Sequence, residues 1–152
     1  MSENNLTTSE NGINLITSFE GFRSSPYLDQ NGIPTIGYGS TYYQDGTKVT
    51  MQDPAITKDQ AIEILQTYVQ KFEAIVNDHV TVSLNQNQFD ALVDFTYNVG
   101  PGNFLSSTLL RLLNQGQYDQ IPAQFMRWNK TNGQPNAGLT RRRQAEADLW
   151  NS

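Results

Sequence analysis

The spacing of apolar residues changes after Gly21 and again near Thr57, and these changes restrict the folds available to the chain. Between Tyr27 and Val49, short segments rich in Tyr, Thr, Ile and Val are separated by the turn signals QNG and QDG. This pattern is typical of a small antiparallel sheet with two or three strands. From Thr57 onward, apolar residues recur at intervals of three and four, which indicates helices. We therefore expect an α+β fold with a small sheet lobe and a helical lobe.

A long helix of about five turns is expected after Thr57. Thr57 and Gln60 have the spacing of a capping box, and seven apolar residues then share one helical face: Ala61, Ile62, Leu65, Tyr68, Val69, Phe72 and Val76. The same criteria predict a helix before the sheet and several after the long helix, over about 8–20, 85–99, 106–114, 118–128 and 139–150. We expect a single domain, residues 1–152, with a sheet lobe over about 13–56. The helical lobe would comprise about 77–152 plus the first helix, and a ligand cleft would lie between the lobes.

Composition excludes several kinds of site and partner. The chain has no cysteine and one histidine, which excludes disulfides, thiolate metal sites and zinc sites built on two histidines. We expect no metal and no cofactor. A net charge of −5 argues against nucleic acid as a partner. No apolar segment approaches the roughly 20 residues of a membrane span, and the first residues lack the pattern of a signal peptide. A cytoplasmic start without membrane insertion is the expectation.

Glu20 is the first candidate catalytic residue. It lies four residues after Ile16 and seven after Ile13, on the apolar face of the first predicted helix. Burial and the C-terminal end of the helix dipole would both raise the pKa of its carboxyl group, as a general acid requires. The alternative is a surface glutamate at a frayed helix end.

Asp29 is the second candidate, and its role depends on the register of the predicted hairpin. A three-residue loop of Asn31, Gly32 and Ile33 would place Asp29 directly opposite Thr35, where the two side chains can hold a water molecule. A two-residue Asn-Gly loop would pair Asp29 with Pro34 instead. Taken by itself, Asp29 is better explained as a residue that caps its own turn.

Two other features suggest ligand contacts. Gly37 and Gly39 are expected to share the face of Thr35 and to leave room for a substrate near the backbone, although a strand kink explains glycines equally well. Three consecutive arginines, Arg141–Arg143, fall in the first turn of a predicted helix, where positive charge is unfavourable. They indicate either an anion site or a partner for a carboxylate, or simply a solvated face.

These residues, in this order, resemble the phage-type lysozymes of glycoside hydrolase family 24. Glu20, Asp29 and Thr35 match the spacing of the family's catalytic residues, PTIGYG matches its hairpin, and NQNQFDALVDFTYNVGPGNF and GLTRRRQAEADLW resemble its later helices. The resemblance extends from about Gly12 to Trp150. Ser40 departs from the family pattern, because many members have histidine there.

The resemblance implies an inverting endolysin that hydrolyses the β-1,4 bond between N-acetylmuramic acid and N-acetylglucosamine in peptidoglycan. Glu20 would protonate the leaving oxygen, and Asp29 with Thr35 would activate water. Arg142 would pair with Glu20, while Gly39, Tyr97 and Ser107 would contact saccharide. It further implies a monomer that accumulates in the host cytoplasm and reaches the wall through holin lesions, with no cofactor.

Two alternatives to a muramidase remain open from the sequence. A lytic transglycosylase needs one acid and consumes no water, so Asp29 and Thr35 argue against it. A non-catalytic wall-binding or tail protein on the same fold would have no reason to keep both acids in register.

Overall fold

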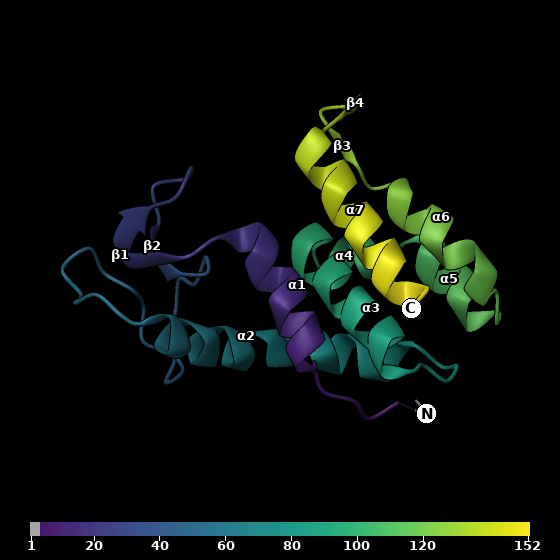
Figure 1. The fold of residues 1–152 in the computed structure, drawn as a ribbon, viewed down its shortest axis with the longest axis horizontal. Helices are drawn as coiled ribbons and strands as arrows, with labels where there is room; N and C mark the ends of the chain where they lie inside the picture. Colours follow the sequence, from purple (N-terminus) through teal and green to yellow (C-terminus); the bar gives the residue numbers. More distant parts are fainter. Residues whose placement is uncertain (1–3) are drawn as a thin grey trace. The chain divides into compact units, whose positions relative to one another are not determined.

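The computed structural model describes residues 4–152, which form an α+β arrangement of seven helices, one 3₁₀ turn and two small antiparallel sheets (Figure 1). The chain divides into two compact units. One contains Ile16–Gln70, and the other contains the residues up to Leu15 together with Lys71–Ser152. The α+β class expected from the sequence is confirmed.

The unit Ile16–Gln70 contains the predicted antiparallel sheet, with two strands rather than three. Strand β1, Arg23–Leu28, pairs antiparallel with β2, Pro34–Gly37, and the register is irregular between Arg23 and Tyr27. A third strand does not form in this unit: the following segment contributes only isolated bridges between Ile36 and Ser40 and between Tyr42 and Lys48. Consecutive turns interrupt that segment too often for a regular strand.

Gly37 has a packing role that the sequence interpretation missed. Its φ of +67° belongs to the left-handed region, and a Cβ atom added there would lie 3.0 Å from the Ala61 Cβ and 3.5 Å from the Ile56 Cδ1. Ala61 belongs to the long helix α2, Lys58–His79. The space beside Gly37 is therefore filled by the protein itself, and the expectation that this glycine leaves room for a substrate is wrong.

The first two helices begin as their sequences predict. Helix α1 spans Glu10–Glu20. The capping box of α2 is confirmed, because the Thr57 amide donates to Gln60 Oε1 at 2.8 Å and the Gln60 amide donates to Thr57 Oγ1 at 3.1 Å. With 22 residues, α2 is about one turn longer than the apolar stripe indicates.

The other unit consists mainly of helices packed around aromatic side chains. Its helices are α3, Gln86–Val99; α4, Pro101–Leu105; α5, Thr108–Asn114; α6, Ile121–Met126; and α7, Ala137–Trp150. A 3₁₀ turn covers Tyr118–Gln120 and a short hairpin pairs β3, Lys130–Thr131, with β4, Gln134–Pro135. Helix α7 lies against α3 and α6 (Figure 1). The Phe95 ring is fully buried and contacts the rings of Phe104, Phe125 and Trp128.

Three details of this unit differ from the sequence prediction. Gly100 ends α3 as expected, but Pro101 at once starts the short helix α4, because proline suits the first position of a helix. The β3–β4 hairpin was not predicted. Helix α7 begins at Ala137, two residues before the predicted start, because the Asn136 side chain accepts a hydrogen bond from the Leu139 amide and caps it.

The N-terminal cap of α3 supplies a stability prediction. Asn85 Oδ1 accepts from the Gln88 amide at 2.8 Å, and Gln88 Oε1 accepts from the Asn85 amide at 3.0 Å. We expect Asn85→Ala to lower the free energy of unfolding by about 1 kcal/mol. Urea unfolding of Asn85→Ala beside Asn85→Ser measures this, because serine retains a capping oxygen. Equal losses in both variants would contradict a capping role.

Two searches of the described residues set limits on other kinds of site. Among residues 4–152, no helix is both long and apolar enough to cross a membrane. The same part of the chain contains no cluster of three or more His, Cys, Asp or Glu side chains arranged to hold a metal ion.

Candidate active site

Glu20 is the last residue of α1, and its side chain is half-buried. Gly39, which follows the β1–β2 hairpin and has φ of +85°, lies beside it. A Cβ atom added to Gly39 would lie 3.5 Å from Glu20 Oε1. Because Gly39 has no side chain, none projects from this position toward the Glu20 carboxyl group, which a substrate must reach in order to receive a proton from it.

Asp29 holds the turn between β1 and β2. Its Oδ1 atom accepts hydrogen bonds from the Asn31 amide at 2.8 Å and from the Ile33 amide at 2.9 Å. This is an Asx turn, in which the carboxylate replaces a backbone acceptor. The turn-capping interpretation of Asp29 is therefore correct, and it involves only one of the two carboxylate oxygens.

The hairpin register differs from both registers considered in the sequence. Tyr27 pairs with Thr35 and Leu28 with Pro34, and the Asp29 amide donates to the Ile33 carbonyl at 3.0 Å. The loop has three residues, but they are 30–32, one position earlier than expected. The prediction that Asp29 lies directly opposite Thr35 is wrong. Because side chains alternate along a strand, Asp29 shares a face with Tyr27 and is the diagonal neighbour of Thr35 on that face.

Thr35 is buried, and the direction of its hydroxyl hydrogen bond determines what it can bind. Its Oγ1 atom donates to the Ile33 carbonyl at 2.8 Å. With its hydrogen committed, the hydroxyl offers lone pairs and can accept a hydrogen bond from water. A water molecule between Thr35 and Asp29 would donate one hydrogen bond to each of them. The lone pairs of the water oxygen would then point away from both side chains. This arrangement suits a nucleophilic water.

The predicted saccharide contacts Tyr97 and Ser107 have internal roles in the helical unit. The Tyr97 ring packs edge-on against Phe72 with centroids 5.3 Å apart, and the Arg142 guanidinium lies 5.9 Å from its centre. Ser107 caps α5: its hydroxyl donates to the Phe104 carbonyl at 2.7 Å and accepts from the Leu110 amide at 3.1 Å. A saccharide contact by either residue stays a prediction.

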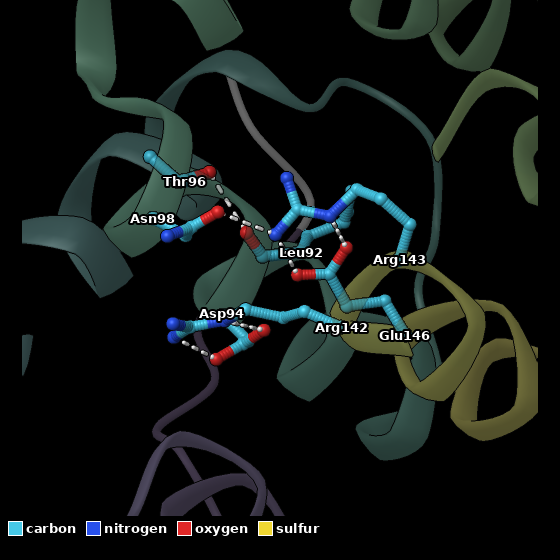
Figure 2. A network of polar contacts seen from close by, with 7 residues as sticks. All are labelled: Leu92, Asp94, Thr96, Asn98, Arg142, Arg143 and Glu146. Carbon is cyan, nitrogen blue, oxygen red and sulfur yellow. Dashed lines mark hydrogen bonds and ion pairs between the residues drawn. The ribbon is translucent and has the colours of Figure 1, made fainter. Parts of the chain in front are cut away.

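Arg142 is held by a partner that the sequence interpretation missed. Its Nε and Nη2 atoms donate to the two oxygens of Asp94 at 3.0 and 2.7 Å, a bidentate pair buried between α7 and α3 (Figure 2). Since α7 begins at Ala137, the arginines lie in its second turn, so the argument from the first turn was wrong. Of the three, Arg141 is exposed, whereas Arg142 and Arg143 are buried.

Arg143 and Glu146 extend the same network. Arg143 Nη2 donates to Glu146 Oε2 and to Asn98 Oδ1, both at 2.8 Å, and Arg143 Nε lies 2.8 Å from Glu146 Oε1 (Figure 2). Both Arg143 and Glu146 are fully buried. The network therefore places two guanidinium groups and two carboxyl groups out of contact with solvent.

The two carboxyl groups titrate in opposite directions. Burial by itself would raise the pKa of Asp94, but hydrogen bonds from Glu146 and Arg142 and the charges of both arginines outweigh it and lower that pKa. Burial, then the hydrogen bond and negative charge of Asp94, hold the pKa of Glu146 well above its usual range against the two arginines. As pH rises, Asp94 therefore loses its proton before Glu146 does.

A sequence signal for Asp94 exists. Asp90 and Asp94 are spaced by four in the otherwise apolar run FDALVDF, and both are fully buried in α3. An acid on the buried face of a helix needs a cation or donors. Asp90 uses the N-terminus of α1, where it accepts from the amide and hydroxyl of Ser9, and Asp94 uses Arg142.

Comparison with known proteins shows which family this chain resembles. The sequence profile of the family described as phage lysozyme matches residues 17–146. The endolysin of Bacillus phage PZA is 46% identical over 97% of this chain and 56% of its own length. The endolysin of Salmonella phage P22 is 40% identical over 93% of this chain and 97% of its own.

Solved structures show the same fold. A crystal structure of a P22 lysozyme variant superposes with a TM-score of 0.90 at 37% identity and covers 97% of this chain and 100% of its own. The lysozyme-like fold is therefore confirmed. This chain nevertheless spans only about half the length of some curated relatives, with 56% and 54% of the Bacillus phage PZA and B103 endolysins covered.

Proposed function

This chain belongs to the phage lysozyme family, and from that premise we propose that it is a phage endolysin with muramidase activity. Its substrate would be the β-1,4 bond between N-acetylmuramic acid and N-acetylglucosamine in bacterial peptidoglycan. The observation that carries the proposal is the hairpin register, which makes Asp29 the diagonal neighbour of Thr35 on one face, in the same compact unit as Glu20.

The proposed reaction assigns one chemical task to each of these residues. Glu20 donates its proton to the glycosidic oxygen as the bond breaks. Asp29 and Thr35 hold a water molecule on the opposite face of the sugar, and Asp29 accepts a proton from it as it attacks. Inversion by this route requires the carboxyl groups of Glu20 and Asp29 to be roughly 6.5–9.5 Å apart, to admit the water.

Other residues are proposed to hold the substrate or tune the acid. Arg142, fixed by Asp94, would present positive charge to Glu20. Gly39 would let the sugar approach the carboxyl group, and Tyr97 and Ser107 would contact saccharide from the helical unit. Asp94 restricts the Arg142 side chain to one orientation, which supports a defined role for its charge.

The proposed biological setting follows from the same premise. The two compact units would form one lysozyme domain, active as a monomer on glycan strands, without nucleic acid and without insertion into a membrane. The protein would accumulate in the host cytoplasm and reach the wall through holin lesions.

Digestion of purified peptidoglycan, with reducing ends, anhydro-sugar ends and free amines scored together, tests the reaction. We expect new reducing ends only. For Asp29→Asn we expect the rate to fall by roughly 100- to 10,000-fold, because the amide cannot accept the proton of the water. The amide oxygen still accepts the two turn hydrogen bonds, so the variant should fold as wild type.

Asp45→Asn is the matched control for this experiment. Asp45 also accepts from the amide two residues on, Thr47, at 2.9 Å, in an exposed turn of the same unit. It should retain wild-type activity. Anhydro-sugar ends, with Asp29→Asn still active, would instead establish a lytic transglycosylase. Binding to peptidoglycan without any new ends would establish a non-catalytic wall-binding protein.

A further inference from the structure

A pocket with a volume of about 390 Å³ lies in the unit that contains Lys71–Ser152. Its lining comes from α3, α4, β3 and α7 and from the two residues that follow α6. None of the residues with a role in the proposed reaction lines this pocket. Its size falls within the range of pockets that hold small organic molecules.

Arg127 and Lys130 line this pocket, and no carboxylate does. Both side chains are exposed, and neither forms an ion pair with another residue of the range 4–152. The buried arginines of α7 differ in this respect, because Arg142 and Arg143 each have a carboxyl partner. Two positive charges are therefore free to bind an anionic ligand.

The sequence around the pocket adds to its positive charge. Residues 120–145 contain no aspartate or glutamate, although they hold five of the chain's ten lysines and arginines. Three of these five side chains are exposed, namely Arg127, Lys130 and Arg141. In a protein with a net charge of −5, this segment attracts anions locally against the field of the whole molecule.

Asn98 gives the pocket a donor whose direction is fixed. Its Oδ1 atom accepts from Nη2 of the fully buried Arg143 at 2.8 Å, so its amide nitrogen is directed away from Arg143 (Figure 2). Asn98 also lines the pocket. Because its oxygen is committed to Arg143, Asn98 offers a ligand its NH₂ donor, in addition to the donors of Arg127 and Lys130.

Three apolar side chains also line the pocket: Val99, Trp128 and Leu139. All three are half-buried. The Trp128 ring is held by an edge contact with Phe95, with the ring centroids 5.9 Å apart. A ligand that fills the pocket therefore needs an apolar group besides its anionic group.

The number of charges and donors distinguishes a phosphate ligand from a carboxylate. A carboxylate carries a single charge, and one guanidinium group satisfies both of its oxygens, as Arg142 does for Asp94. A phosphate monoester carries a charge of about −1.5 to −2 at pH 7 and has three strong acceptor oxygens. Two cations and one amide donor match the phosphate more closely.

We propose that this pocket binds a small phosphate monoester that has an apolar or aromatic organic group. Arg127, Lys130 and the Asn98 amide bind the phosphate, and Trp128 packs against the organic group. This site goes beyond the proposed function, and its binding is measured without hydrolysis, so either one can fail while the other holds.

Calorimetric titration of the full chain with phenyl phosphate tests the site. We expect one ligand per chain, with the affinity falling roughly three- to tenfold in Arg127→Gln and in Lys130→Gln, because each variant removes one charged donor. Lys130→Arg keeps the charge and should stay within about twofold of wild type. Asn98→Asp should also weaken binding, because its carboxylate still accepts from Arg143 but repels the phosphate.

Arg111→Gln and Lys48→Gln are the matched controls for these variants. Each makes the same chemical change at an exposed position outside the pocket, and each should bind phenyl phosphate as wild type does. Losses equal to those of Arg127→Gln and Lys130→Gln would show that only the net charge matters, and the site would be refuted.

Two further ligands test the chemical class. Inorganic phosphate lacks the organic group, and benzoate replaces the phosphate by a carboxylate, so both should bind more weakly than phenyl phosphate. Equally tight binding of benzoate would overturn the assignment to phosphate, and equally tight binding of inorganic phosphate would overturn the role of Trp128. If phenyl phosphate neither releases nor absorbs heat and leaves the unfolding temperature unchanged, the pocket does not bind this class of ligand.

Discussion

Glu20→Gln is expected to fold as wild type and to lose roughly 100- to 10,000-fold in the rate of peptidoglycan hydrolysis. Glutamine has the size and shape of glutamic acid but has no proton to donate to a leaving oxygen. Glu20 ends α1 and is only half-buried, so the exchange removes no buried ion. Release of reducing ends measures the activity, and thermal unfolding shows whether the fold is intact.

Glu63→Gln provides the control for this prediction. It makes the same chemical change at an exposed position of α2 and should leave activity unchanged. A Glu20→Gln variant that hydrolyses peptidoglycan at near the wild-type rate would exclude Glu20 as the acid. Loss of activity together with a lowered unfolding temperature would show that Glu20 supports the fold rather than the chemistry.

The largest expected effect on stability comes from Asp94→Asn. Asp94 is the ionised partner of Arg142 inside the protein, and the amide would leave the buried Arg142 guanidinium group without its negatively charged partner. Removing one partner of a buried ion pair costs roughly 3–5 kcal/mol. Chemical unfolding at neutral pH should show a loss of that size.

Glu146→Gln makes the same chemical change in the same network and should cost about 1 kcal/mol or less. The raised pKa of Glu146 favours its neutral form, whose hydrogen bonds an amide can reproduce: the oxygen accepts from Arg143 and the nitrogen donates toward Asp94. Equal damage by Asp94→Asn and Glu146→Gln would show that Glu146 is ionised and would contradict this assignment.

The same variant has a distinct effect on the pH dependence of stability. The folded-state pKa of Glu146 is raised, so the unfolded chain loses this proton first as pH increases from about 4.3, the ordinary value for glutamate. The stabilising contribution is complete below that pH and is lost as pH rises toward the folded-state value. Glu146→Gln should remove this part of the decline in the free energy of unfolding with rising pH. Unfolding measurements at several pH values would detect the difference.

Local chemistry explains what could be predicted from the sequence. The caps at Thr57 and Asn85 satisfy backbone groups with side chains three residues away, so their evidence lies within one turn of the chain. The glycines at 100 and 116 likewise follow helix ends, with φ of +97° and +78° that other residues rarely adopt.

Other features depend on partners that a local pattern does not contain. The hairpin register is set by the two hydrogen bonds of Asp29 to the turn, and the loop begins one residue earlier than in either expected register. In the sequence, Gly37 fits a strand kink or an open surface equally well. Only the folded structure shows that Ala61 packs against it. Asp94 and Arg142 are 48 residues apart, and nothing local identifies them as a pair.

Asp29 has a structural role in the turn and a proposed role in catalysis, and these two roles affect how the protein can evolve. One carboxylate oxygen accepts both turn hydrogen bonds, and an asparagine oxygen would do so equally well. A single transition in an aspartate codon yields asparagine, so purifying selection for folding does not oppose that substitution. Retention of the acid would depend on selection for lysis alone. If that selection were lost, one nucleotide change would yield a folded protein that keeps the surface for binding glycan but does not hydrolyse it.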